Sequence, residues 1–420
     1  MRLDVSSRHG GGVYDELRNA VPAKEFLSEG KITLLEKLSV IFPSPGTYSV
    51  SFLCTLLDGS TVDYVDVVDA YYVRRELREL SIRDKNLFLD TFLTLYHTGA
   101  AEGVKLFGAH YKPLSYFEKM HLDAAASRRV DHIHDGMGFI TQHMALTAEM
   151  ELALQSVEPS LTIPYWDYTI DSVEIQKASA ATGRGAVDAT IFDDSILFAE
   201  DFFGQTSGKA HTVTSGRFAH LSVPVIRGSE QEAIDTISPR GFLRAPWNLN
   251  PNKYVTRYHK VCGEDIILAD DTDLQWPTCE SHRALSNAGP GEVFSWYDWV
   301  WAASYKPHGP VHAWIGGIGG ECEEAFSTLK ENGFITVTQE KLLKHSSFEI
   351  LKNMWRHYLI EVPKVCAEDA PVSECTWTCI QDVESHVHAK ALLSYANITE
   401  ANTPHFSEVA KEVFCDTTWW

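Results

Sequence analysis

The sequence lacks any long apolar run, although 44% of its 420 residues are hydrophobic. A helix that spans a bilayer needs about 20 consecutive apolar residues, so we expect no membrane span. Basic residues are also in the minority, because 36 of them face 57 acidic residues and the formal net charge is -21. Such a surface repels nucleic acid and anionic membranes. We therefore expect neither as a partner.

Several signatures of enzyme chemistry are missing as well. The sequence contains no P-loop, no Rossmann glycine fingerprint and no recognisable Ser–His–Asp arrangement. No cysteine lies within the histidine motifs described below, which argues against a thiolate metal site.

The first 20 residues have no apolar segment of the signal-peptide kind. Nevertheless, eight cysteines and a glycosylation sequon at Asn397 favour an oxidising compartment. We expect a secreted protein, or one of the secretory or vacuolar system, with its leader already removed. The alternative is a cytosolic protein with scattered buried thiols. Four cysteines fall within the last 60 residues, and we expect them to pair there: Cys366, Cys375, Cys379 and Cys415.

Two histidines stand out in the stretch 131–167. His134 and His143 are nine positions apart, which on one straight helix is a rotation of about 900° and places the rings on opposite faces. They can converge only if the chain bends between them, and Gly136 and Gly138 permit such a bend. The spacing therefore predicts that His134 precedes a helix and that His143 lies in its first turns.

Other segments also present histidines. His308 and His312 are at i and i+4, a spacing that stacks both rings on one helix face and suits a shared metal. His345 follows, with Glu349 one turn later, and His121 ends a short amphipathic segment. Ligation by imidazole alone favours Zn, Cu, Ni or Fe over Mg or Ca.

These motifs resemble those of the tyrosinase family. The pattern H-x4-F-I-x-Q-H-x7-E, followed by L-x-x-P-Y-W-D, resembles the first copper motif of tyrosinases, catechol oxidases and molluscan haemocyanins. HGPVHAWIGG, from His308, resembles the opening of the second copper motif, and HSSFEILKNMW, from His345, resembles its close. The resemblance runs from about residue 72 to about residue 362.

The chain also departs from the family pattern. Met144 replaces an arginine, Glu349 replaces an aspartate, and Lys344 stands where a second histidine is common. His132 occupies the position of a cysteine that many relatives join to a ligand as a thioether, so that crosslink is not available here.

The resemblance implies two copper ions, with dioxygen and a phenolic small molecule or tyrosyl group as substrates. The implied ligands are His121, His134 and His143 at one copper and His308, His312 and His345 at the other. His110 or His97 could replace His121. Glu151, Asp167 and Glu349 are candidates to hydrogen-bond the ligand rings, or else they are packing and helix-end carboxylates.

The coarse pattern predicts a mainly α protein. Alternating stretches separated by Asp58-Gly59 indicate a hairpin, and from residue 74 onward the periodicity is helical. Ser81 and Asp84 are start signals for the first helix, and a later helix over 299–315 is expected to be broken at Pro307 and Pro310. We expect a small β element at 1–70, a helical bundle holding a dinuclear copper site at 71–362, and a cysteine-containing tail at 363–420. Residues 170–250 show no sustained periodicity and predict a long connection.

Two functions are compatible with this site. The first is oxidation of o-diphenols to o-quinones, with or without hydroxylation of monophenols, and the second is dioxygen binding as in a haemocyanin unit. The motif is not repeated in the chain, which favours the enzyme. A zinc hydrolase using some of the histidines is a weaker alternative.

The residue after His308 is also informative about the substrate. In the family, an asparagine there and a glutamate several residues earlier are associated with monophenol hydroxylation. Here the position is Gly309, and the nearest upstream acid is Asp298. The sequence thus predicts catechol-type oxidation, unless Asp298 serves as the base.

Overall fold

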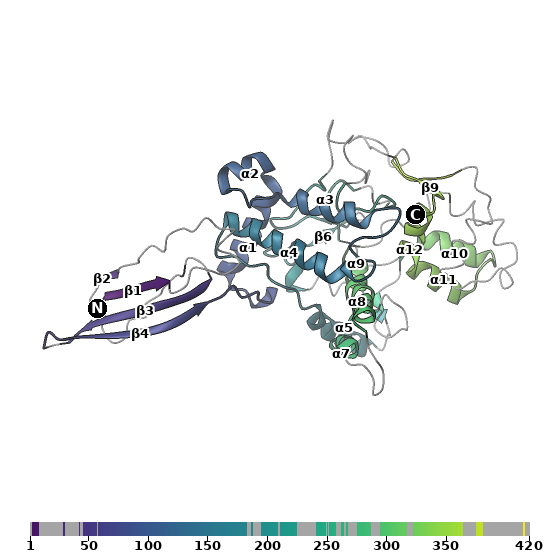
Figure 1. Cartoon of the computed structure of the whole chain (residues 1–420). Helices are drawn as coiled ribbons and strands as arrows, with labels where there is room; N and C mark the ends of the chain where they lie inside the picture. Colours follow the sequence, from purple (N-terminus) through teal and green to yellow (C-terminus); the bar gives the residue numbers. More distant parts are fainter. Residues whose placement is uncertain are drawn as a thin grey trace.

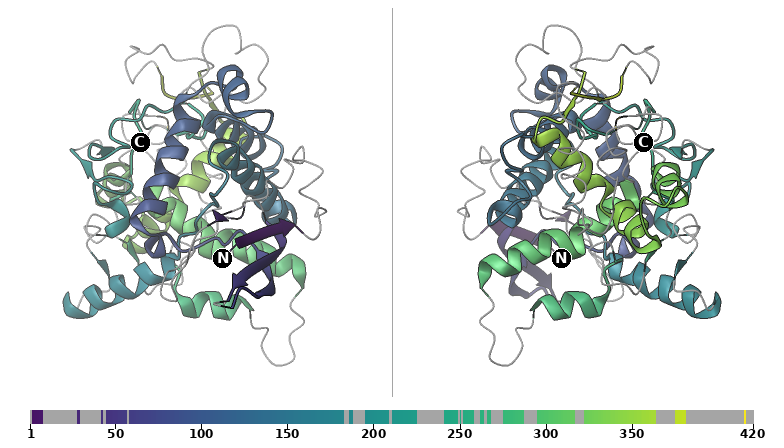
Figure 2. Two further views of the ribbon diagram at one scale, coloured as in Figure 1. Left: turned by 90° about the vertical axis from the view of Figure 1, so that its left-hand side faces the viewer. Right: turned by 90° about the vertical axis from the view of Figure 1, so that its right-hand side faces the viewer.

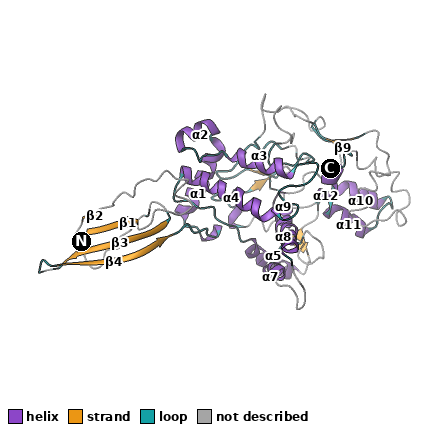
Figure 3. Ribbon diagram, viewed as in Figure 1, coloured by secondary structure: helices purple, strands orange, loops and turns teal. Residues whose placement is uncertain are grey.

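The computed structural model describes most of the chain. The described residues are 2–7, 28–29, 42, 45–56, 58–182, 186–187, 195–208, 211–224, 241–248, 250, 252–257, 262–263, 266–267, 275–286, 295–316, 322–363, 375–380 and 415. The sequon at Asn397 and most of the tail lie outside them. The fold is mainly α with a small N-terminal β element, as predicted (Figure 3).

The N-terminal element is an antiparallel sheet that extends away from the helices (Figure 1). Its strands are ordered β2-β1-β3-β4, and their bounds are Arg2–Ser7 for β1, Ser28–Glu29 for β2, Gly46–Thr55 for β3 and Thr61–Ala70 for β4. The predicted hairpin joins β3 to β4. Gly59 takes a φ of +83° there, a conformation that favours glycine, and its N–H donates to the Leu56 carbonyl at 3.0 Å.

The first helical half contains α1 to α5. Their bounds are Ile82–His97 for α1, Ala100–Phe107 for α2, Leu114–Ala125 for α3, Gly138–Val157 for α4 and Tyr168–Thr182 for α5. The Ser81 side chain accepts from the Asp84 N–H and caps α1, as its sequence predicts. Leu89, Phe117 and Leu154, from α1, α3 and α4, are buried in one apolar cluster.

The second helical half follows after the central segment. Its helices are α7 (Cys279–Ser286), α8 (Trp296–Ala303), the π-helix η4 (Ser304–His308), α9 (Gly309–Gly316), α10 (Glu323–Glu331), α11 (Val337–His345) and α12 (Ser347–Arg356). Ile350, Leu351 and Met354 place one face of α12 in a second apolar cluster. Phe348 packs against both clusters and so joins the halves. Figure 2 views the molecule from the two ends of Figure 1, with the first half in blue and teal and the second in green and yellow.

Short elements complete the description. They are the 3-10 helices η1 (Leu77–Glu79) and η2 (Ile196–Phe198), and the paired strands β5 (Ala186–Val187) with β8 (Ile266–Ile267), β6 (Thr206–Ser207) with β7 (Thr212–Val213), and β9 (Ile360–Glu361) with β10 (Thr378–Cys379). Among the described residues, no helix is long and apolar enough to cross a membrane.

The structure corrects the sequence-based elements at three places. Residues 168–182 form α5 rather than part of a connection. The sequence did not indicate this helix, because its apolar residues do not gather on one side and so give no helical period. The helical chain is not broken at Pro307 and Pro310. Pro307 lies within η4, and α9 begins at the residue before Pro310. His345 and Glu349 lie on different helices, because α11 ends at His345 and α12 begins after Ser346.

Disulfide bonds are present at the second half of the protein and in the tail. Cys262 is bonded to Cys322 at the start of α10, and Cys379 is bonded to Cys415. The second of these agrees with the predicted pairing of late cysteines. Cys375 is also disulfide-bonded, whereas Cys279 is an exposed free thiol.

Candidate metal centre

Three histidines from separate segments meet at one point. His121 projects from α3, His134 from the loop before α4, and His143 from the second turn of α4. One ring nitrogen of each lies within 4.8 Å of the others. The structure thus places His121 in this group, whereas His97 lies exposed at the end of α1 against Tyr96.

The bend that was expected between His134 and His143 is present. Gly136 takes a φ of +94° and α4 begins at Gly138. Just ahead of the bend, the Asp131 carboxylate accepts the backbone N–H groups of Ile133 (3.2 Å) and His134 (2.9 Å). This turn orients the His134 ring toward the start of α4.

A second pair of histidines lies against the first group. The ring centroids of His308 and His312 are 4.4 Å apart, and the His308 ring is 5.6 Å from His134 and 5.7 Å from His143. His308 is the last residue of η4. Pro307 has no N–H to donate, and a π-turn at that position keeps the chain helical up to the histidine, as is frequent at functional sites.

The sixth predicted ligand, His345, is only 5% exposed at the end of α11. Ring contacts join the other five histidines to one another. The place of His345 beside His308 and His312 stays a prediction.

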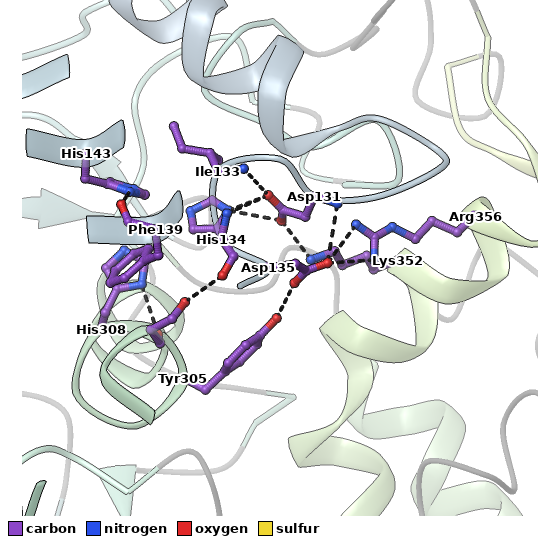
Figure 4. A network of polar contacts seen from close by, with 11 residues as sticks. Asp131, Ile133, His134, Asp135, Phe139, His143, Tyr305, His308, Lys352 and Arg356 are labelled. Carbon is purple, nitrogen blue, oxygen red and sulfur yellow. Dashed lines mark hydrogen bonds and ion pairs between the residues drawn. The ribbon is translucent and has the colours of Figure 1, made fainter. Parts of the chain in front are cut away.

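The hydrogen bonds of the rings select which nitrogen faces the cluster (Figure 4). Nδ1 of His143 donates to the Phe139 carbonyl at 2.8 Å, and Nδ1 of His308 donates to the Ser304 carbonyl at 3.2 Å. Nδ1 of His134 lies 3.0 Å from both oxygens of Asp131. In each ring Nε2 is left for a metal. The Nε2 atom of His143 is buried and has no hydrogen-bond partner among the described residues, so the donor set fits a copper ion.

Burial keeps these imidazoles neutral, which is the form that binds metal. Burial, reinforced by the neighbouring histidines, lowers the pKa of the half-buried His121 to about 3. Burial is also the main cause that lowers the pKa values of His143 and His308.

Two of the three carboxylates proposed from the sequence to support the rings have other partners. Glu151 pairs with Arg74 and accepts the Ile163 N–H, and Asp167 accepts from the N–H and hydroxyl of Thr169 at the start of α5. Glu349 lies in the first turn of α12. A hydrogen bond between any of the three and a ligand ring stays a prediction.

Asp131, which sequence reasoning missed, is a carboxylate that contacts a ligand ring, that of His134. Its position three residues before His134 was the available signal, because an Asp side chain readily binds the backbone of the next turn. Burial would raise the pKa of Asp131, but the hydrogen bond from His134 and the Lys352 ammonium outweigh it and hold the pKa well below its usual range.

A network of polar contacts extends from this carboxylate to α12 (Figure 4). Lys352 lies 2.9 Å from Asp131. Asp135 accepts from the Tyr305 hydroxyl and lies 3.4 Å from Arg356. The loop that carries His134 is thus attached both to η4 and to α12.

Comparisons with known proteins agree with this site. Residues 109–330, which are 222 of the 420, match the common central domain of tyrosinase. The chain is 27% identical over 264 residues to grixazone synthase of Streptomyces griseus, covering 59% of this chain and 75% of that one. It is 26% identical over 139 residues to the tyrosinase-like protein tyr-3 of Caenorhabditis elegans, covering 33% of this chain and 16% of the relative. The chain belongs to the tyrosinase family of copper oxidoreductases.

Proposed function

We propose that this protein uses dioxygen to oxidise o-diphenols to o-quinones at a pair of copper ions. The observation that carries the proposal is the contact between the two histidine groups, with His134 and His308 centroids 5.6 Å apart. In the balanced reaction, two diphenols give two quinones, and the four electrons and four protons released convert one O2 into two waters.

The six histidines predicted from the sequence would hold the metals. His121, His134 and His143 would bind one copper, and His308, His312 and His345 the other. Copper, when bound, supplies the redox chemistry that passes electrons from the phenol to dioxygen. The protein supplies neutral, oriented imidazoles, and Phe139 packs against His143 (4.6 Å) and His308 (4.9 Å) and excludes water between them.

The surroundings of His308 support diphenols over monophenols as substrates. A phenol has a pKa near 10, so a monophenol needs a nearby base before its oxygen can reach a metal. Gly309 offers no such group. Asp298 is exposed in the first turn of α8, where its carboxylate accepts from the hydroxyl of the N-cap residue Ser295, and this contact argues against its service as the base.

The oxidising compartment expected from the sequence is part of the same proposal. Four cysteines form two disulfides, Cys262 with Cys322 and Cys379 with Cys415. Such bonds persist where thiols are not kept reduced, which supports the secretory route.

Oxygen uptake by the copper-loaded protein tests the proposed reaction. Catechol should be consumed in a ratio of two per O2, and His308→Ala should abolish this uptake. His132→Ala is the matched control, because His132 is exposed and lies beside His134. Reversible binding of dioxygen without consumption of catechol would instead indicate a carrier and would contradict the proposal.

A further inference from the structure

The Asp131 carboxylate contacts the histidine cluster directly. It is 2% exposed, and both of its oxygens lie 3.0 Å from Nδ1 of His134. The other described ring partners, the carbonyls of Phe139 and Ser304, are neutral. Of the three rings whose partners are described, those of His134, His143 and His308, the His134 ring is the one that faces a charged acceptor.

Lys352 completes the arrangement from the other half of the protein. Its ammonium lies 2.9 Å from Oδ2 of Asp131, and the side chains of Lys352 and Asp131 are 13% and 3% exposed. A buried carboxylate is costly unless it is paired, so Lys352 is its compensating charge. Lys352 lies on α12, the helix that follows His345.

Asp135, in the same loop, provides a comparison. Its carboxylate contacts the Tyr305 hydroxyl, the Arg356 guanidinium and the Asp131 N–H. These contacts also link the loop to the second half of the protein, but they reach no histidine ring. A comparison of variants at the two aspartates therefore distinguishes an effect on the attachment of the loop from an effect on the His134 ring.

We propose that Asp131 is a positioning residue of the copper centre and that Lys352 is its charge partner. This inference rests on the proposed function. The carboxylate holds the proton of His134 on Nδ1, presents Nε2 to the metal and makes this imidazole a more electron-rich ligand than rings that donate to carbonyls. Lys352 moderates that effect, so the pair sets the reduction potential of the copper at His121, His134 and His143.

The first test uses the copper-free wild-type protein. Nitrogen-15 NMR of labelled histidine reports which ring nitrogen carries the proton, and we expect Nδ1 for His134. A proton on Nε2 would overturn the inference. This readout needs neither copper nor turnover, so it is independent of whether the proposed function holds.

The second test compares Asp131→Asn and Lys352→Met in the copper-loaded protein. Asp131→Asn removes negative charge beside His134, so it should raise the reduction potential and weaken copper binding by about 10- to 100-fold. Lys352→Met removes positive charge and should lower the potential. A purely structural role would not give opposite shifts.

Asp135→Asn is the matched control and should leave the potential unchanged. The double variant Asp131→Asn/Lys352→Met should recover stability relative to Asp131→Asn, because it no longer leaves a buried ammonium unpaired. Shifts in the same direction, or an equal shift in Asp135→Asn, would overturn the inference. Absence of copper from the wild type would instead count against the proposed function.

Discussion

The imidazole rings of His134 and His308 lie nearly parallel, 28° apart, with their centroids separated by 5.6 Å. One ring comes from the loop before α4 and the other from η4, so each half of the protein contributes a wall of the site. The Ser304 hydroxyl, which donates to the His134 carbonyl at 3.2 Å, fastens the same two segments together. Changes at either segment should therefore affect both groups of histidines.

Gly309→Asn should raise the turnover of monophenols relative to diphenols. Gly309 has helical φ and ψ of -55° and -51°, and an added Cβ would meet the Ser304 carbonyl oxygen at an ordinary 3.7 Å. The asparagine therefore fits and can hold a water that accepts the phenol proton. Because general-base assistance is worth about 10²-fold or more, we expect at least about a tenfold change in the ratio of oxygen-uptake rates.

Gly309→Ala is the control for that experiment. It occupies the same space without an amide, so it should leave the ratio unchanged. Equal ratios in the alanine and asparagine variants would show that Gly309 does not determine the preference.

Gly136→Ala should destabilise the bend between His134 and His143. Gly136 has a φ of +94° and an added Cβ would meet no atom within 4 Å, so the cost comes from the backbone conformation alone. We expect a loss of about 1–2 kcal/mol in the free energy of unfolding, together with weaker copper binding, both measured by chemical denaturation with and without metal. Gly316→Ala, at a position with open space and no positive φ, should cost less. Equal losses in the two variants would argue against the role of the bend.

The local features that the sequence predicted correctly depend on short-range chemistry. The hairpin at Asp58-Gly59, the cap at Ser81 and the bend at Gly136 each follow from the conformational preferences of a few adjacent residues. The convergence of His134 and His143 could be predicted for the same reason, because their spacing permits it only with a bend.

The features that were missed depend on contacts between distant segments. Lys352 and Asp131 meet only after α12 packs against the loop before α4, and neither residue indicates the other in the sequence. The π-helix at Pro307 was also missed, because the proline indicates a break, whereas the chain passes through it as a π-turn between α8 and α9. The helix α5 was not recognised because its apolar residues are not confined to one face.

The copper-free protein should lose stability as the pH falls below about 6.5. The pKa of His121 is about 3 in the folded state, whereas an unfolded histidine has a pKa near 6.5. Between these values the unfolded chain binds more protons, so the contribution of His121 is complete above pH 6.5 and is lost on acidification. Each histidine adds a slope of at most about 1.4 kcal/mol per pH unit.

Denaturant unfolding at pH 7 and pH 5 measures this slope. His121→Gln should make it shallower, while His132→Gln, which changes an exposed ring, should leave it as in the wild type. The carboxylates that titrate in this range are common to all three proteins and cancel in the comparison. An unchanged slope in His121→Gln would contradict the expected protonation.

Metal content measured together with catechol oxidation tests the central claim most directly. The account predicts two copper ions per chain in the active wild type, and His143→Ala and His308→Ala should each lose about one copper and nearly all activity. His132→Ala should keep both ions and full activity. Zinc as the native metal, or full activity in His143→Ala or His308→Ala, would contradict it.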